Sequence, residues 1–298
     1  MGFEQCHPAV NLIYFVAVIA GTVWFDHPVF LLISFGCAFA YSVKRNGWRA
    51  VAFNLCLIPL IVAYGLYYSS YNHFGVTSLQ QNFIGNQMTL ESLVYGLVIG
   101  CILAGVVMWM SCVYAVFSSD KVVYLFGRVS PKLSLFLSIL LRLIPRIKTE
   151  AKRIHTAQRG IGRGIGQGSF PERMRNAMRV VSMLITWTIE SLVTASESMQ
   201  SRGSTLRGRT AFSIYRFDNR DRGYVIGLFA CLTVTMMGIL LNQTQMRYNP
   251  KIVMNPVTPM SWVFFAGYCA LCLMPLGLDV YTEWSFRRAR RHILEQDE

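Results

Sequence analysis

The residue types that most often carry out chemistry are present in this chain, but their spacing does not assemble an active site. Cys269 and Cys272 form a C-x-x-C pair, a spacing that metal and redox sites use. No second pair or histidine cluster accompanies it, and cysteine inside an apolar run behaves as a small apolar residue. The five histidines are too scattered along the chain to form a set of metal ligands. We therefore expect no metal site and no bound cofactor.

A glycine-rich run at 160–168 is a second candidate, because such runs can cradle phosphate groups. It alternates glycine with other residues and lacks the G-K-[ST] ending with which a Walker A loop holds phosphate and magnesium. No serine, histidine and aspartate set is evident elsewhere in the chain. We expect a flexible helix exit at this run, and a protein that is not an enzyme.

Two expected helices end in the same way, with an arginine followed directly by a glycine. The motifs are Ala157-Gln158-Arg159-Gly160 and Gln200-Ser201-Arg202-Gly203. The helix dipole favours an exposed arginine in the last turn by about 0.3–1 kcal/mol, and the planar guanidinium can bind a carboxylate through two hydrogen bonds. One such motif alone is typical of an ordinary helix end. A matched pair, with the two arginines 43 residues apart, instead favours docking to two equivalent receptors.

Two long helices are expected to position these motifs. Apolar residues recur at three- and four-residue steps over 131–159, and Gly160 supplies a stop because a left-handed residue often closes a helix. A second helix is expected from Pro171, which suits a first helical turn, to Gly203. Its apolar stripe favours packing against the first helix over a contact surface for a partner, and consists of Met174, Met178, Val181, Leu184, Ile185, Leu192 and Met199.

The rest of the chain has the composition of a membrane protein. Of its 298 residues, 53% are apolar and 14% charged, against about 25% charged in soluble domains. Apolar runs of the length that spans a bilayer lie at 9–25, 29–43, 50–68, 93–117, 224–241 and 262–278. None contains Asp, Glu, Lys or Arg, whereas ion and substrate pathways usually need one. The sequence predicts an all-α polytopic membrane protein, with six transmembrane helices and two long cytoplasmic helices, and it does not favour a pore.

The charge distribution predicts the orientation in the membrane. The segment 120–222 holds 19 of the 28 Lys and Arg residues, and such residues stay on the cytoplasmic side during insertion. Both termini are therefore expected in the cytoplasm. We expect four parts, namely transmembrane helices 1–4 at 1–118, a cytoplasmic domain of two long helices at 119–222, transmembrane helices 5–6 at 223–280 and a cytoplasmic basic tail at 281–298.

Long helices that end in Ala-Arg-Gly or Ser-Arg-Gly, placed between N-terminal and C-terminal membrane helices, resemble the T component of energy-coupling factor (ECF) transporters. These are ABC-type importers of vitamins and metal ions in prokaryotes. The layout agrees over the whole chain, and the specific likeness lies in 148–209. The segment 196–203 matches its signature closely. The first signature departs at Gln158, where the family often has alanine, and in its glycine-rich continuation.

The resemblance implies a coupling role in a prokaryotic cell membrane. Two cytoplasmic ABC ATPases, forming a homodimer or a heterodimer, would each receive one helix end in a groove. Arg159 and Arg202 would be the groove contacts, with Gly160 and Gly203 allowing close approach. ATP-driven motion would pass to a membrane-embedded S component that binds the cargo. The chain itself would bind neither ATP nor cargo, and its remaining contacts would be with membrane lipid.

Two alternatives remain open at this point. A membrane-anchored enzyme or adaptor would use the basic segment to bind an anionic lipid or phosphate substrate, but no convincing nucleophile or acid–base pair lies near it. A nucleic-acid adaptor would need aromatic residues among the basic ones, and this segment has few. We therefore expect no nucleic-acid partner.

Overall fold

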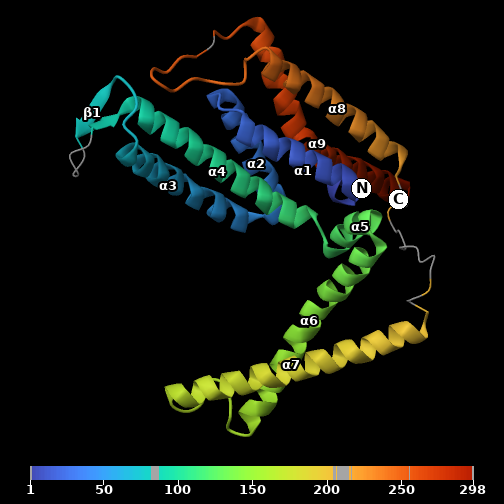
Figure 1. Ribbon diagram of the computed structural model, residues 1–298. Coiled ribbons are helices and arrows are strands. Elements are labelled where there is room, and N and C mark those ends of the chain that lie inside the picture. The colour runs from blue at the N-terminus through green and yellow to red at the C-terminus, as the bar shows by residue number, and fades with distance from the viewer. Residues whose placement is uncertain are drawn as a thin grey trace. The chain divides into compact units, whose positions relative to one another are not determined.

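The computed structural model describes residues 2–81, 87–203, 206, 215, 217–254 and 256–296. Within these ranges the chain forms nine α-helices and one short two-stranded sheet, so the all-α prediction is confirmed (Figure 1). The chain divides into two compact units. The bundle unit comprises Met1–Ser118 and Tyr215–Glu298, and the coupling unit comprises Ser119–Ile214.

The bundle unit is built from six helices, each of which covers one predicted apolar run to within one residue. They are α1 (Pro8–Trp24), α2 (Pro28–Asn46), α3 (Trp48–Tyr71), α4 (Leu90–Val116), α8 (Asn219–Leu240) and α9 (Pro259–Gln296). A one-turn 3-10 helix at Phe3–Gln5 precedes α1. An antiparallel hairpin of β1 (Ser78–Gln81) and β2 (Gln87–Thr89) joins α3 to α4, and hydropathy did not predict it.

Six described helices are long and apolar enough to cross a membrane, judged by length and composition alone. They are α2, α3, α4, α8, residues Pro259–Arg290 of α9, and α7 (Phe170–Ser201) of the coupling unit. This set includes α7, which was not predicted to span the membrane, and lacks α1, which was. The apolar helix α1 has 17 residues, close to the minimum of about 17 that a bilayer core needs.

Aromatic side chains fill the centre of the bundle unit. Trp109, Tyr14, Tyr41 and Tyr268 are the largest side chains with almost no exposed surface. They come from α4, α1, α2 and α9, so helices that lie far apart in the sequence share one core. Tyr14 packs edge-on against Trp109 with ring centroids 6.3 Å apart, one of the geometries that aromatic pairs prefer.

Four polar side chains at the centre of the bundle unit form hydrogen bonds, which offset the cost of burying a polar group in an apolar environment. The hydroxyl oxygens of Thr22 and Ser34 lie 2.6 Å apart, and the Trp109 indole N–H donates to the Ser34 hydroxyl at 3.0 Å. The Tyr14 hydroxyl donates to the Cys272 carbonyl at 3.1 Å. These bonds connect α1, α2, α4 and α9.

Glycines bring α3 and α4 into close contact. A Cβ atom built on Gly96 would lie 3.0 Å from the carbonyl oxygen of Gly65, and one built on Gly100 would lie 3.1 Å from that of Ile61. Gly96 and Gly100 have the small-xxx-small spacing with which membrane helices approach closely. A side chain at either position would push the two helices apart.

The N-terminal segment is held at one end of the bundle unit by charged residues. The Phe3 N–H donates to the Asp279 carboxylate at 2.7 Å, and the His7 N–H donates to the Asp221 carboxylate at 3.2 Å. Arg45 forms an ion pair with the Glu4 carboxylate at 2.6 Å. The start of α1, the end of α2, the start of α8 and the later part of α9 therefore lie together. We call this the basic end.

The coupling unit contains the two predicted long helices and a shorter one that was not predicted. They are α5 (Ser119–Val129), α6 (Pro131–Gly160) and α7 (Phe170–Ser201). Proline occupies the first turn of α6 and of α7, where its missing N–H costs nothing. Ser169 and Glu172 form a reciprocal capping box at the start of α7, which satisfies two backbone donors.

Candidate functional site: two arginine-bearing helix ends

The end of α6 is closed by a pair of backbone hydrogen bonds around Gly162. The Gly162 N–H donates to the Arg159 carbonyl at 3.2 Å, and the Arg163 N–H donates to the Gln158 carbonyl at 2.9 Å. Gly162 has a φ of 77°, the left-handed region that glycine enters without a steric cost. This is a Schellman motif, and it satisfies two carbonyls that the helix leaves free.

The prediction that Gly160 ends α6 in the left-handed conformation is wrong. Gly160 is the last helical residue, and the left-handed glycine is Gly162, two residues later. The glycine-rich run therefore contains the true helix end. Arg159 lies within the last helical turn instead of at its last position. The physical reason is that Gly160 can continue the helix, while Gly162 can supply the positive φ.

The end of α7 agrees more closely with the prediction. Ser201 is the last helical residue, Arg202 is the C-cap, and Gly203 follows with a φ of 78°. The Gly203 N–H donates to the Gln200 carbonyl at 2.9 Å. The predicted left-handed glycine is confirmed here. Residues 204, 205 and 207–209, at the end of the segment that carries the family likeness, lie outside the described part of the chain.

Both arginine side chains are exposed and have no partner within the described residues. Arg159 and Arg202 belong to the exposed class, and none of the ion pairs or side-chain hydrogen bonds of the described chain involves either guanidinium. Ala157, Gly160 and Ser201 are exposed as well, whereas Gln158 and Gly203 are partly buried. Each helix end thus presents a cation that is free to bind an external carboxylate.

The end of α6 rests on α7, so the two ends differ in their surroundings. The Gln158 side-chain amide donates to the Met183 sulfur at 3.6 Å, and the Asn176 side-chain amide donates to the Gly164 carbonyl at 3.3 Å. Gly164 in turn donates its N–H to the Gln167 side chain at 2.9 Å. The residues that follow α6 are therefore fixed against the first half of α7, and the two helices cross in Figure 1.

Most of the predicted apolar stripe of α7 is exposed, and the favoured interpretation as packing against α6 is wrong for those residues. Met174, Met178 and Ile185 are 61%, 66% and 55% exposed, while Val180, which the stripe omitted, is buried. An exposed apolar face is costly in water. The alternative interpretation, a contact surface for a partner, therefore fits these side chains.

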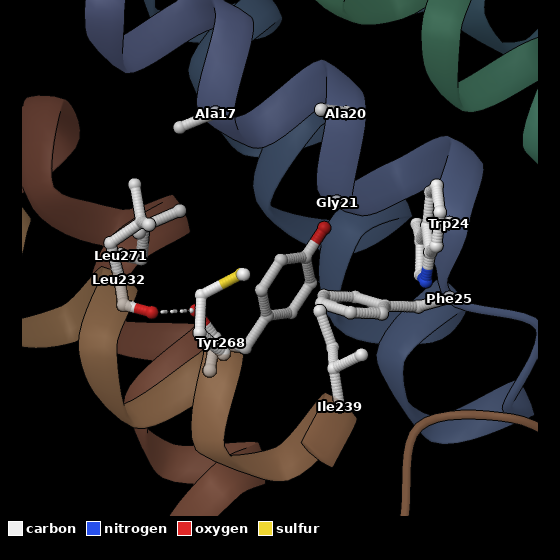
Figure 2. A pocket seen from close by; sticks show the side chains of 11 residues that line it. Ala17, Ala20, Gly21, Trp24, Phe25, Leu232, Ile239, Tyr268 and Leu271 are labelled. Carbon is white, nitrogen blue, oxygen red and sulfur yellow. Dashed lines mark hydrogen bonds between the residues drawn. The ribbon is translucent and has the colours of Figure 1, made fainter. Parts of the chain in front are cut away.

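The described residues contain no group of three or more His, Cys, Asp and Glu side chains that could hold a metal ion. The eight cysteines are free thiols. A cavity of about 280 Å³ between α1, α8 and α9 is lined by apolar side chains, among them Trp24 and Tyr268, with Thr235 donating to the Leu232 carbonyl at 2.9 Å (Figure 2). No charged residue lines this cavity, so it suits an apolar group and not an ion.

Comparison with known proteins agrees with the likeness drawn from the helix ends. The family model described as CbiQ, cobalt transport protein, matches residues 4–212. A protein of Exiguobacterium sibiricum named energy-coupling factor transporter transmembrane protein EcfT is 32% identical over 116 residues, 37% of this chain and 40% of that protein. A protein of the same name from Lacticaseibacillus paracasei is 34% identical over 96 residues, 30% of this chain and 34% of that protein.

The two matches to relatives cover less than half of those proteins' length, whereas the family model covers most of this chain. Both relatives are named as transmembrane proteins of transporters. The chain therefore belongs to the CbiQ family of transport proteins, and its resemblance to the T components of energy-coupling factor transporters is confirmed.

Proposed function

We propose that this chain is the transmembrane scaffold subunit of an ECF transporter, which passes the ATP-driven motion of two ABC ATPases to an S component. The observation that carries the proposal is the presence of two exposed arginines, Arg159 and Arg202, at two helix ends of one unit, without a partner among the described residues. A guanidinium at such a position can bind a carboxylate in a groove through two hydrogen bonds. Two ends then serve two ATPase subunits, one groove each.

Gly160 supports a close external approach at the end of α6. Its φ is not positive, and a Cβ atom built on it would meet nothing within 4 Å. Neither the backbone conformation nor the packing of this chain therefore requires glycine there. An ATPase groove that approaches the backbone next to Arg159 supplies the reason for a residue without a side chain.

Exposed apolar side chains on α6 and α7 support the contact with the S component. They include Met174, Met178 and Ile185 on α7 and Phe136 and Ile144 on α6, each more than half exposed. Methionine is flexible enough to adapt to more than one partner surface. The S component binds the vitamin or metal ion, so this chain has no need of a catalytic or cargo-binding group.

The contacts at the basic end support cytoplasmic termini. The N-terminal segment is bonded to the ends of α2, α8 and α9, and Lys44 forms an ion pair with Glu283 at 2.6 Å. These contacts support a location of the basic residues Lys44 and Arg45 on the same side as the N-terminus, while Arg247 and Lys251 lie in the loop between α8 and α9. By the positive-inside rule that side is the cytoplasm of a prokaryotic cell, and the coupling helices and the basic tail are then cytoplasmic too.

A pull-down in mild detergent tests this proposal. The tagged full-length chain is purified from its own cells, and the bound proteins are identified by mass spectrometry. We expect two ABC ATPase subunits, identical or different, and a small membrane protein. The identity of that membrane protein would indicate the transported substrate. Recovery of the folded chain without any ATPase would contradict the proposal.

A further inference from the structure

The end of the bundle unit opposite the basic end carries aromatic side chains of the kind that lie at a membrane surface. Trp24 at the end of α1, Tyr71 at the end of α3 and Trp262 at the start of α9 are 60%, 67% and 68% exposed. Tryptophan and tyrosine are enriched where the apolar core of a bilayer meets its headgroups. We call this the aromatic end, and we expect its loops at the level of lipid headgroups.

A polar pocket of about 590 Å³ opens at the aromatic end. It is lined by side chains of four segments, the α1–α2 loop, the end of α3 with its following loop, the start of α4, and the loop between α8 and α9. Its charged and aromatic lining residues are Asp26, Tyr68, Phe74, Tyr95, Arg247 and Tyr248. The function proposed above uses none of them.

Four aromatic rings form a connected wall of this pocket. The Tyr95 ring lies 5.4 Å from that of Tyr248, 5.6 Å from that of Tyr68 and 5.7 Å from that of Phe74, measured between centroids. The interplanar angles range from 50° to 75°. Rings that are inclined to one another present faces and edges to a shared space, and the faces attract an organic cation.

One acidic and one basic residue line the same pocket without pairing. No ion pair within 4.0 Å joins Asp26 to Arg247 among the described residues, and no hydrogen bond there involves either side chain's charged group. Burial raises the pKa of the Asp26 carboxyl above its usual value. The protein thus bears the cost of a partly desolvated carboxylate that has no internal cation beside it.

The frame around the two charges is held by backbone contacts. The Tyr248 hydroxyl donates to the Asp26 carbonyl at 2.7 Å, which fixes the α8–α9 loop to the α1–α2 loop. The His27 N–H donates to the Thr244 carbonyl at 3.3 Å. Arg247 is held by its own backbone, which pairs with Val253 through two hydrogen bonds at 2.9 and 3.3 Å. The pocket is therefore built before any ligand binds.

An acidic and a basic residue that line one pocket without pairing suit a ligand that carries both charges itself. We propose that this pocket binds the phosphoethanolamine headgroup of a membrane phospholipid, with its ammonium group between the Asp26 carboxylate and the rings of Tyr68, Tyr95 and Tyr248. The phosphate meets the Arg247 guanidinium. A primary ammonium supplies three N–H donors for a carboxylate, and a guanidinium binds phosphate through two hydrogen bonds. The acyl chains extend along the apolar surface of the bundle.

The test compares two short-chain lipids on the purified full-length chain by native mass spectrometry. Dihexanoyl phosphatidylethanolamine carries the ammonium group, and dihexanoyl phosphatidylglycerol has the same chains without it. We expect the former to bind about tenfold more tightly, as a charge-assisted hydrogen bond predicts. Asp26→Asn, which keeps the shape and removes the charge, is expected to abolish this preference. Equal binding of both lipids, or an unchanged preference in Asp26→Asn, would overturn the proposal.

A pair of matched variants in the α8–α9 loop tests the phosphate contact. Arg247→Gln removes the pocket cation, and Lys251→Gln removes an exposed cation that does not line the pocket. We expect Arg247→Gln to weaken phosphatidylethanolamine binding about tenfold and Lys251→Gln to leave it unchanged. Thermal unfolding without added lipid checks that each variant is folded. Equal loss in both variants would show a non-specific charge effect and refute the site.

Free O-phosphoethanolamine distinguishes a lipid from a soluble ligand. If the pocket serves a lipid, the free headgroup displaces the bound lipid only at far higher concentration, because the acyl chains add apolar contact. Displacement at equal concentration would mean that the site takes a soluble zwitterion, and would overturn the assignment to lipid. None of these outcomes depends on ATPase binding, so this inference and the proposed function fail separately.

Discussion

The ends of α6 and α7 have similar sequences, but the two helices end in different positions relative to the arginine. At α7 the cap residue is Arg202 and the left-handed glycine follows at once. At α6 the helix continues through Gly160, and the left-handed glycine is Gly162. Arg202 therefore stands where the helix stops, whereas Arg159 stands one residue before the last helical position. An arginine–glycine pair in the sequence does not by itself fix where the helix closes.

The comparison assigns different physical roles to the two glycines. Gly203 is required by the backbone, since its φ of 78° is unfavourable for residues with a Cβ atom. Gly160 has ordinary helical geometry and open space where a Cβ atom would be. Gly203 is needed for the backbone conformation of this chain, whereas Gly160 leaves space for a partner chain. Substitutions at the two positions should therefore separate stability from binding.

The largest effect is expected from removing both arginines. Arg159→Ala and Arg202→Ala should each weaken ATPase binding about tenfold, because each removes a charge-assisted contact. The double variant should weaken it about a hundredfold, since the effects of independent sites add as free energies. Affinity is measured by titrating the purified ATPases against the chain in detergent or nanodiscs.

Two exposed arginines on the same helices serve as controls for this prediction. Arg142 lies on α6 and Arg179 on α7, both away from the helix ends. Arg142→Ala and Arg179→Ala should leave the affinity within about threefold, the scale of a surface charge change. If only one of the two end variants had an effect, the two ends would not be equivalent docking sites.

The next effect is a loss of stability at the end of α7. Gly203→Ala places a Cβ atom on a left-handed residue, which costs about 1–2 kcal/mol, and should increase hydrogen exchange of the last α7 turn. The matched change Gly160→Ala should have the opposite sign, a gain of up to about 0.5–1 kcal/mol, because alanine favours the helix. Equal destabilisation by both would show that the two glycines have the same role.

Gly160→Ala should at the same time weaken the ATPase complex, although it stabilises the free chain. The added methyl group occupies the space that an approaching groove needs. Gly166→Ala is the control, since Gly166 also has open space around it and no positive φ. Tighter or unchanged ATPase binding by Gly160→Ala would contradict the proposed close approach.

The smallest effect is expected at the start of α7. Ser169→Ala removes the capping box with Glu172 and should cost about 1 kcal/mol of helix stability. ATPase affinity should change less than about threefold, because the capping box forms no contact with Arg159 or Arg202. Circular dichroism during heating and the ATPase titration measure the two effects separately. A large loss of affinity would extend the docking surface beyond the helix end.

Hydropathy and periodicity were sufficient to predict the long helices. The six apolar runs and the two coupling helices appear as helices, because length, apolar content and flanking prolines are local properties. The boundaries shift by a few residues except at α9, which continues to Gln296, 18 residues beyond the predicted run. The hairpin of β1 and β2 was missed, since Ser78–Gln81 has little of the β-branched and aromatic content that favours strands. The amphipathic helix α5 was missed because it is short.

The misplaced end of α6 shows where local reasoning fails. Five glycines alternate over 160–168, and each is a suitable helix stop by itself. The left-handed glycine that closes α6 is Gly162, and the residues that follow contact other parts of the chain. For example, the Asn176 side chain on α7 donates a hydrogen bond to the Gly164 carbonyl. The pocket at the aromatic end was missed for the same reason. Its residues Asp26 and Tyr248 are 222 positions apart in the sequence.

Site-specific photocross-linking tests the central claim most directly. A photoreactive amino acid is placed at position 159 or 202, with positions 142 and 179 as controls, in cells that produce the whole transporter. The account predicts cross-links to the ATPases from positions 159 and 202 and none from the controls. ATPase cross-links from the controls alone, or from none of the four positions in an assembled complex, would contradict the role of the two helix ends.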